Sequence, residues 1–400
     1  MRMSTQQMFS QANASLLAQQ SEMSHVQQQM ATGRRILSPS DEPVAAAAVL
    51  QTVQSMAFNQ RHADNQTAAV ATLNLAESTL GSVGDALQNV REQLLAANNG
   101  AYNDSDRTSI ATNLDALRGQ LLGLANARDG AGGFLFSGFN QSGVPFVLTA
   151  SGASYTGDDG QRQVEVGPQR SMAVSVNGAS TFMSIPNGNG VFSINAGAIN
   201  AGTGIIDAGR VANPSALTGH QYQIAFTGPA AYDVIDVTLG AAVSTGNAYA
   251  PDTAIVIAGM QTAISGAPAA GDVFNIDPSK NQDVFTTISN AIAALKTPTV
   301  NGAGLAAMTN QVNAALTCLD RAAETALTAR TVVGSRQAEI SRLQEITSAH
   351  NVEHQRRLSE LQDLDYAKAA SDVARQQMIV EASQQTFART SKLNLFDYLR

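Results

Sequence analysis

The 400-residue sequence predicts a mainly α protein with a β-rich insert. Near both ends of the chain, small and apolar residues recur at alternating spacings of three and four, which is typical of helices with a coiled-coil seam. Between about residues 134 and 282, apolar and polar residues alternate instead, and Gly, Asn, Asp and Pro mark turns. Because helices bracket the strands, we predict an antiparallel long-helix coiled-coil bundle formed by the N- and C-terminal segments, with the β domain projecting from its far end.

The first helical segment, residues 1–30, combines an apolar seam with a Gln-rich, nearly uncharged surface. It lacks the Glu/Lys pairs that stabilise an isolated helix, so we expect it to need a partner in order to fold. Its seam is therefore a predicted assembly interface. The seam positions are Phe9, Ala12, Leu16, Met23, Val26 and Met30.

The stretch "MATGRRILSPSDEPVAAAAVL" breaks this helix and starts another. Gly33 interrupts the seam, Ser40 or Asp41 can cap the next helix, and Pro43 suits its first turn. We interpret this stretch as a hinge between two rods. Arg34, which with its neighbouring arginine could grip an acidic surface, is more simply explained as a solvated side chain at a helix break.

Three more helical segments have seams that we predict to form the core of the bundle. The first two seams consist of Ala69, Leu73, Ala76, Leu80, Val83, Leu87, Val90, Leu94 and Ala97, and of Ile110, Leu114, Leu117, Leu121 and Leu124. After the insert, helix returns at Phe285, Ile288, Ile292 and Leu295. The longest seam then runs through Leu305, Met308, Val312, Ala315, Leu319, Ala322, Ala326, Ala329, Val333, Ile340 and Leu343.

A last apolar stripe occupies the C-terminal segment, and we predict that it also belongs to the assembly interface. A chain with such an uncovered stripe needs a partner for it, first a chaperone and later a polymer core. The stripe consists of Tyr366, Ala370, Val373, Val380 and Phe387, followed by Leu395 and Leu399.

Within the insert, three turn-rich stretches carry specific expectations. "GAGGFLFSG" should end a helix and start a strand, and "GDDGQ" between "SYT" and "RQVEV" should be a hairpin turn rather than a calcium site. The stretch "INAGAINAGTGIIDAG" is Gly-rich enough to be either turn-dense or poorly ordered.

Composition argues against several classes of function. The formal net charge is −8 and there is no dense Lys/Arg block, which argues against nucleic acid and anionic membrane surfaces as partners. No apolar run is long enough to span a bilayer, and the N-terminus lacks the apolar core of a secretory signal. The single cysteine, Cys318, excludes intrachain disulfides and sits among seam residues, so we expect a buried inert thiol.

The string "HNVEH" offers the one catalytic-looking motif, because His350 and His354 would share a helix face with Glu353 as a general base. A zinc peptidase is therefore a remote alternative. The motif is short and a working site needs a third ligand and a pocket, so we predict a polar helix face, no bound metal or cofactor, and no enzyme.

Several segments resemble a known family. "QQQMATGRRILSPSDEPVAAA" resembles the N-terminal signature of the flagellin superfamily, and "SPSDEPVAAA" resembles its hook-filament junction branch. Filament flagellins tend to have Lys-Asp-Asp-Ala-Ala-Gly at that place. Further segments that resemble the junction branch are "YNDSDRTSIATNLDALRGQLLGLANARDGAGGFLFSG", "YTGDDGQRQVEVGPQRSMAVSVNG" and the tail "LDYAKAASDVARQQMIVEASQQTFARTSKLNLFDYLR".

The resemblance implies a structural subunit that joins hook to filament in the bacterial flagellum, with filament flagellin as the alternative. It implies extracellular localisation after export by the flagellar type III system, with a cytoplasmic export chaperone and neighbouring axial proteins as partners. It also implies three domains. These are a terminal helical domain that is disordered in the monomer (1–42 and 358–400), a helical rod domain (43–140 and 283–357) and a β-rich outer domain (141–282).

Overall fold

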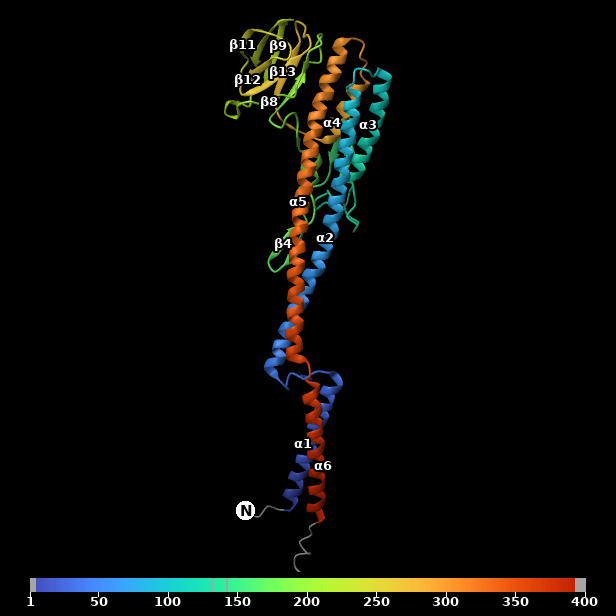
Figure 1. Ribbon diagram of the computed structural model, residues 1–400, viewed down its shortest axis with the longest axis vertical. Helices are drawn as coiled ribbons and strands as arrows, with labels where there is room; N and C mark the ends of the chain where they lie inside the picture. Colours follow the sequence, from blue (N-terminus) through green and yellow to red (C-terminus); the bar gives the residue numbers. More distant parts are fainter. Residues whose placement is uncertain (1–4, 131, 142, 393–400) are drawn as a thin grey trace, which may run out of the picture. The chain divides into compact units, whose positions relative to one another are not determined.

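The structure is a computed structural model that describes residues 5–130, 132–141 and 143–392. Helices occupy both ends of the described chain and the strands lie between them, which confirms the predicted fold class of a mainly α protein with a β-rich insert (Figure 1). The helices are α1 (Thr5–Thr32), α2 (Pro43–Ala97), α3 (Asp104–Ala125), α4 (Val284–Lys296), α5 (Gly302–Gln362) and α6 (Tyr366–Lys392).

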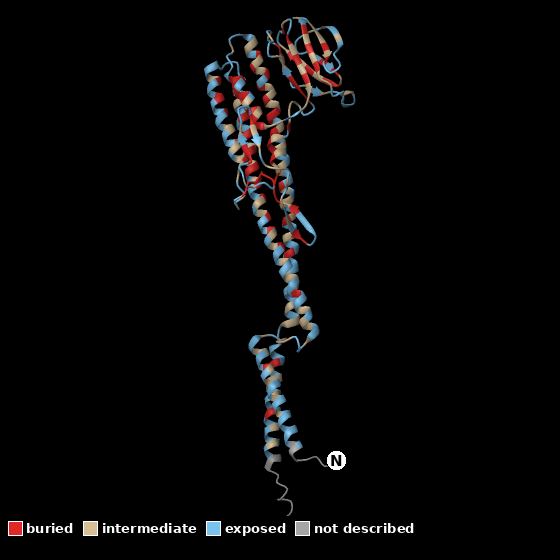
Figure 2. Cartoon of the chain, turned by 180° about the vertical axis from the view of Figure 1, so that it is seen from behind, coloured by how far each residue is buried: buried red, intermediate tan, exposed pale blue. Residues whose placement is uncertain are grey.

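The chain divides into two compact units, and each is described by itself. The first unit contains the described residues up to Asp64 and from Leu343 onward, and the second contains Asn65–Arg342. Helices α2 and α5 each have one part in the first unit and another part in the second. Buried residues are frequent in the second unit and sparse in the first (Figure 2).

The helical core of the second unit is built from the predicted seams. All nine seam residues of α2 between residues 69 and 97 are buried, and so are most of those on α5. Polar pairs run beside the seam. The side-chain oxygen of Asn74 accepts from the Gln337 amide at 2.9 Å, and the Asn98 amide donates to Asn313 at 3.1 Å. Helices α2 and α5 are therefore antiparallel in this unit.

Local capping explains where the two shorter helices of this core begin. Asn103 and Asp106 form a capping box at the start of α3, in which each side chain accepts from the other residue's main-chain N–H. Asp283 caps α4 by accepting from the Thr286 N–H at 2.7 Å. Helices α3 and α4 contact each other, and α4 buries the predicted residues of its seam.

Three strand pairs pack near these helices. They are β1 (Phe146–Leu148) with β2 (Ala153–Tyr155), β3 (Gln163–Gly167) with β4 (Arg170–Ala173), and β5 (Ile185–Pro186) with β15 (Asn281–Gln282). An aromatic cluster joins this region to α4. Phe182 lies with its ring centroid 5.2 Å from Phe136, 5.3 Å from Phe146 and 6.4 Å from Phe285.

The residues that lie between β5 and β15 in the sequence form a separate core of two sheets. One sheet has the order β11-β10-β9-β14-β6 and the other β12-β13-β7, with β8 paired to β13. Large apolar side chains from both sheets form one buried cluster. The strands are β6 (Phe192–Ala196), β7 (Ile205–Ile206), β8 (Arg210–Val211), β9 (Tyr222–Gly228), β10 (Ala231–Asp236), β11 (Ala241–Ala248), β12 (Ala254–Ile257), β13 (Met260–Ser265) and β14 (Val273–Pro278).

Two of the three expectations for the turn-rich stretches were wrong. "GAGGFLFSG" follows helix α3 as predicted, but its described residues start no strand, because Phe134 makes only an isolated bridge with Arg128. "GDDGQ" is no hairpin turn, because β2 pairs with β1 and β3 with β4. The carboxylate of Asp158 instead accepts from the main-chain N–H groups of Phe139, Asn140 and Gly160.

The third stretch, "INAGAINAGTGIIDAG", contains the end of β6, a turn at residues 198–199 and strand β7, so turns make up only part of it. The buried carboxylate of Asp272 accepts from the N–H groups of Ala201 and Gly202 and holds the turn between β6 and β7. Cys318 is buried as predicted, and burial raises the pKa of its thiol. Among the described residues, no helix is both long and apolar enough to cross a bilayer.

Candidate functional site: the joint and the terminal helix pair

The joint, which we define as residues 33–42, lies where the sequence predicts a helix break. Helix α1 ends at Thr32 and α2 begins at Pro43. Gly33 has a φ of +69°, a left-handed conformation that suits glycine at a helix end. A Cβ added there would also lie 3.0 Å from the hydroxyl oxygen of Tyr366, but that exposed side chain can move, so the backbone conformation is the main reason for glycine.

Two main-chain hydrogen bonds connect the joint to the segment between α5 and α6. The N–H of Leu364 donates to the Gly33 oxygen at 3.0 Å, and the N–H of Arg35 donates to the Gln362 oxygen at 2.8 Å. Arg34 and Asp363 face each other between these bonds as an isolated antiparallel bridge. Two chain segments far apart in sequence therefore break their helices side by side and share backbone hydrogen bonds.

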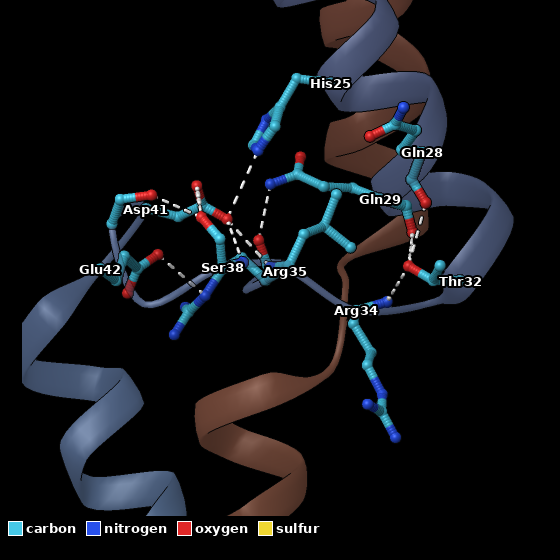
Figure 3. A network of polar contacts seen from close by, with 11 residues as sticks. His25, Gln28, Gln29, Thr32, Arg34, Arg35, Ser38, Asp41 and Glu42 are labelled. Atoms are coloured by element: carbon cyan, nitrogen blue, oxygen red, sulfur yellow. Dashed lines mark hydrogen bonds and ion pairs between the residues drawn. The ribbon is translucent and has the colours of Figure 1, made fainter.

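Arg35 adds side-chain contacts to this connection. Its guanidinium donates to the Leu361 oxygen at 2.8 Å, and its Nε lies 3.2 Å from a carboxylate oxygen of Glu42 (Figure 3). The main-chain oxygen of Arg35 accepts from the Gln29 amide at 2.6 Å. The ion pair with Glu42 is partly exposed and contributes little by itself, so the hydrogen bonds to main-chain oxygens matter more for holding Arg35.

Asp41 organises the joint itself, and its role differs from the prediction. Its Oδ2 accepts from the N–H groups of Leu37 and Ser38, both at 2.9 Å, and its Oδ1 accepts from the Ser38 hydroxyl at 2.9 Å (Figure 3). Asp41 therefore bonds backward into the joint and does not cap α2. Ser40 does not cap it either, since its hydroxyl lies 2.5 Å from that of Ser38.

These hydrogen bonds stabilise the charged form of Asp41. The N–H of Ser38, then its hydroxyl and the N–H of Leu37, lower the pKa of this carboxyl group from 3.8 to about 2. The Nε2 of His25, on α1, lies 3.4 Å from the same carboxylate. Asp41 thus connects the joint to the helix that precedes it.

Sequence reasoning missed the residues on the other side of the joint. Asp365 caps α6, because its Oδ1 accepts from the N–H groups of Ala367 and Lys368 at 3.0 and 3.1 Å. An Asp directly before the apolar stripe is a recognisable N-cap signal that could have been used. The pairing of residues 361–364 with the joint has no local signal, because it depends on tertiary contact.

The predicted interface residues on α1 and α6 lie on two helices that contact each other in the same chain (Figure 1). Val26 and Val380 are buried, whereas Phe9 and Tyr366 remain exposed. The rings of Phe9 and Phe387 meet edge to face with centroids 5.5 Å apart. The half-buried members are Leu16, Met23, Met30, Val373 and Phe387, and Leu395 and Leu399 lie outside the described residues.

Seven-residue spacing relates the two sides of this pair. Phe9, Leu16, Met23 and Met30 are one heptad apart along α1, and Phe387, Val380, Val373 and Tyr366 are one heptad apart in reverse order along α6. The ring contact of Phe9 with Phe387 at one end and the bridge of Arg34 with Asp363 at the other fix the direction. We therefore expect Leu16 beside Val380 and Met23 beside Val373.

Outside this seam, the first unit exposes many large apolar side chains. On α2, four of them are clearly exposed, Val44 at 86%, Leu50 at 68%, Val53 at 46% and Phe58 at 48%. The opposite side of the same stretch includes polar residues beside the partly buried Val49 and Met56. There Thr52 is buried, and Asn59 donates to the Thr347 oxygen at 3.0 Å and to Asn351 Oδ1 at 2.8 Å.

The "HNVEH" residues lie on α5 and do not converge with further ligands. His350 and His354 have ring centroids 6.4 Å apart. Glu353 is engaged by Arg356, whose guanidinium donates to it at 2.7 Å and lowers its pKa. Within residues 5–130, 132–141 and 143–392, no group of three or more His, Cys, Asp or Glu side chains is arranged to hold a metal ion.

Comparisons with known proteins agree with this architecture. A family model described as the bacterial flagellin N-terminal helical region matches residues 3–141. Flagellar hook-associated protein 3 of Salmonella typhimurium is 28% identical over the full length of both chains.

Solved structures extend the likeness to the fold. The crystal structure of FlgL from Xanthomonas campestris (space group C2) is 33% identical with a TM-score of 0.73, and the match covers 77% of this chain and 99% of that one. The flagellar junction protein FlgL from Legionella pneumophila is 28% identical with a TM-score of 0.72, covering 79% and 100%. Because these matches share both sequence and fold over nearly all of their own length, the chain belongs to the flagellin superfamily, in its hook-associated protein 3 branch.

Proposed function

We propose that this chain is a structural subunit of the bacterial flagellum, located outside the cell, that joins hook to filament by axial coiled-coil packing. The relatives named as hook-associated protein 3 and as a flagellar junction protein support this role. They also favour it over filament flagellin and over an enzyme. In this proposal the first unit carries the packing, with its helices paired in antiparallel fashion and set against those of neighbouring axial proteins.

The observation that carries the proposal is the exposed apolar face of the first stretch of α2. Leu50, Val53 and Phe58 face solvent, while Thr52 and Asn59 face the helix that covers them. No ionisable residue occurs from Pro43 to Gln60. A monomer gains nothing from an exposed apolar and uncharged helix face, whereas a polymer can bury it against a neighbouring subunit.

The terminal helices extend this argument. Described α1 contains Glu22 as its one carboxylate and His25 as its one histidine, with no Lys or Arg, so it depends on its contacts with α6 and with the joint. We propose that residues 1–42 and 358–400 form a terminal domain that becomes stably folded on assembly. Residues 43–140 and 283–357 would then form the rod domain, and residues 141–282 the outer domain.

The joint would act as the boundary between terminal and rod domains. Gly33, Arg34, Ser40, Asp41 and Pro43 form our proposed hinge motif. Its main-chain hydrogen bonds to residues 362–364 allow the joint and the segment between α5 and α6 to change direction together. Such a joint can turn as one body while the helices on either side keep their own packing.

The C-terminal stripe would have two successive partners. Before export by the flagellar type III system, a cytoplasmic export chaperone would cover Val373, Val380 and Phe387. After export, the polymer core would cover the same face. This order is supported by the stripe itself, because before α1 and α6 pair no described part of the chain covers it, and an uncovered apolar helix face promotes aggregation unless something binds it.

A strain that lacks this chain tests the proposal directly. We expect hooks without filaments and flagellin shed into the medium, and we expect the full chain to restore filaments. A variant with Leu50→Asp and Phe58→Asp should not restore them, whereas Leu327→Asp, an exposed position in the second unit, should. Normal filaments in the deletion strain would show that the proposed junction role is wrong.

A further inference from the structure

The sequence contains five Asn–Gly pairs, and such pairs share a chemical weakness. The main-chain nitrogen of the residue after an asparagine can attack the side-chain amide carbon, and glycine favours this attack because it has no Cβ and its backbone turns freely. The attack requires the asparagine side chain to fold back over its own glycine, so contacts that fix the side chain oppose it. The pairs are Asn99–Gly100, Asn177–Gly178, Asn187–Gly188, Asn189–Gly190 and Asn301–Gly302.

Two of the pairs are fixed in the turn that precedes β6. The Oδ1 of Asn187 accepts from the N–H of Lys280 at 2.9 Å. The Oδ1 of Asn189 accepts from the N–H of Phe192 at 3.0 Å, and its amide donates to the Gly209 oxygen at 3.3 Å. Each side chain is therefore held by partners other than the glycine that follows it.

Two further pairs lie where a helix begins. The Oδ1 of Asn177 accepts from the N–H of Ser180 at 2.9 Å, and its amide donates to the main-chain oxygen of Asp159 at 3.1 Å. The Oδ1 of Asn301 accepts from the N–H of Gly304 at 2.8 Å, in the first turn of α5. Attack by the following glycine would break these contacts at the helix starts, which opposes the reaction.

Asn99 differs, because only a local contact holds its side chain. It lies with Gly100 in the exposed loop between α2 and α3. Its Oδ1 accepts from the N–H of Ala101 at 3.0 Å, in a turn that folds the side chain back toward Gly100. Among the described residues, no group accepts a hydrogen bond from its amide nitrogen. The side chain of Asn99 can therefore reach its glycine without breaking a contact of the folded core.

We propose that Asn99 is a deamidation site of this chain. The Gly100 nitrogen forms a bond to the side-chain carbon of Asn99, and the amide nitrogen leaves as ammonia together with the proton of the Gly100 N–H. A water molecule then opens the resulting cyclic imide at one of its two carbonyl carbons. The product is aspartate or isoaspartate, and both carry an added negative charge.

The products change the loop that connects α2 to α3. In isoaspartate the main chain runs through the former side-chain carbon, so the Asn99 oxygen that accepts from the Tyr102 N–H at 3.2 Å becomes part of a free carboxylate. The capping box of Asn103 and Asp106 fixes the start of α3 independently, which confines the change to the loop. Under the proposed function the chain works outside the cell, beyond the enzymes of the cytoplasm, so the modified form accumulates as the flagellum ages. The site itself does not depend on that function.

Ageing of the purified full chain in mildly alkaline buffer tests the site, with peptide mapping by mass spectrometry as the readout. We expect Asn99 to deamidate at least about tenfold faster than each of the other four asparagines, because its opening involves only an exposed loop. In concentrated urea, all five pairs should react at similar rates, since nothing then holds the other four. Faster reaction at another pair in the folded chain, or an equal preference for Asn99 in urea, would overturn the inference.

A variant at the attacking residue tests the chemistry. A Cβ added to Gly100 would have no neighbouring atom within 4 Å, so Gly100→Ala should keep the fold and slow the loss of the Asn99 amide at least about tenfold. Gly119→Ala, on α3, also places its Cβ in open space and should leave the reaction rate unchanged. Calorimetry should show that neither variant lowers the melting temperature. An undiminished rate in Gly100→Ala would show that the glycine nitrogen is not the nucleophile and would overturn the inference. Because these are measurements on the isolated chain, they stand apart from the deletion strain that tests the junction role.

Discussion

Helix α2 contains two stretches that differ in how far their large apolar side chains are buried. From residue 69 to residue 97 the face toward the bundle is apolar, and Leu73, Leu80 and Leu94 are fully buried there. From residue 43 to residue 64 the covered face includes buried Thr52 and His62, while Leu50 is exposed.

The difference indicates which interactions stabilise each stretch. An apolar covered face gains most of its stability inside its own chain, because burial of each large side chain contributes about 1.5–3 kcal/mol. Where polar side chains occupy the covered face, the stretch gains mainly satisfied hydrogen bonds, which contribute about 0.5–1.5 kcal/mol each. We infer that the second unit is complete by itself and that the first unit depends on further molecules.

The largest expected effect comes from charging the covered seam of the first unit. Val380→Asp with Phe387→Asp places carboxylates against α1, where each lost apolar contact costs about 1.5–3 kcal/mol and desolvation adds more. We expect complete loss of incorporation into flagella and of binding to the export chaperone. Motility and a chaperone pull-down measure these two outcomes.

The same double variant also separates the two units. Because both residues lie in the first unit, the melting transition of the second unit should stay unchanged. Met378→Asp, on an exposed position of the same helix, is the matched control for a single added charge in the pull-down. A double variant that swims normally and still binds the chaperone would contradict the role given to this seam.

The next largest effect is expected in the apolar stretch. Leu80 is 0% exposed, and its replacement by Ala should cost about 2–5 kcal/mol through lost burial and a residual cavity. The melting temperature of the second unit should fall by about 5–15 °C. Leu75→Ala, at a position that is 38% exposed on the same helix, should cost less than about 1 kcal/mol. Similar shifts for both variants in calorimetry would argue against an apolar core at this seam.

A smaller effect is expected in the polar stretch. Asn59→Ala removes the bonds to Thr347 and Asn351 and should cost about 1–2 kcal/mol of local stability. Hydrogen exchange of amides near these residues should become faster. Replacing the neighbouring exposed residue, Gln60→Ala, should change these exchange rates little. Replacing both Asn59 and Asn351 by Leu should restore or increase protection, since neither amide side chain is then left unpaired. Continued fast exchange in that double variant would mean that polarity is not what weakens this stretch.

Periodicity predicted the second unit's seam well, because each position from Ala69 to Ala97 repeats a spacing that only a helix can use. The same reasoning could not detect the polar seam of the first unit. Thr52 and Asn59 occupy inward positions that look like surface, and only contact with α5 shows otherwise. The spacing of apolar residues alone does not show which face of a helix is covered by its neighbour.

The joint was predicted from Gly33 and Pro43, whose backbone preferences are local. The hydrogen bonds of Asp41 were not predicted. An N-cap residue is expected to accept from N–H groups that follow it in the chain, whereas this carboxylate accepts from the N–H of Ser38, which precedes it. Its connection to residues 361–364 also has no local signature. In the insert, alternation identified strands but could not identify partners, which is why "GDDGQ" was taken for a hairpin turn.

The smallest effect concerns the joint, where Asp41 makes stability depend on pH. Its pKa is lowered from 3.8 to about 2 by the N–H of Ser38, the Ser38 hydroxyl and the N–H of Leu37. A lowered pKa in the folded state means that the carboxylate stabilises the joint above about pH 4 and loses this contribution as the pH falls toward 2. The amide signals of Leu37 and Ser38 should therefore shift with a midpoint near pH 2. In Asp41→Asn this transition should disappear, whereas Glu42→Gln, whose side chain contacts Arg35 instead, should retain it. A transition that survives in Asp41→Asn would show that another group controls these amides and that Asp41 does not organise the joint.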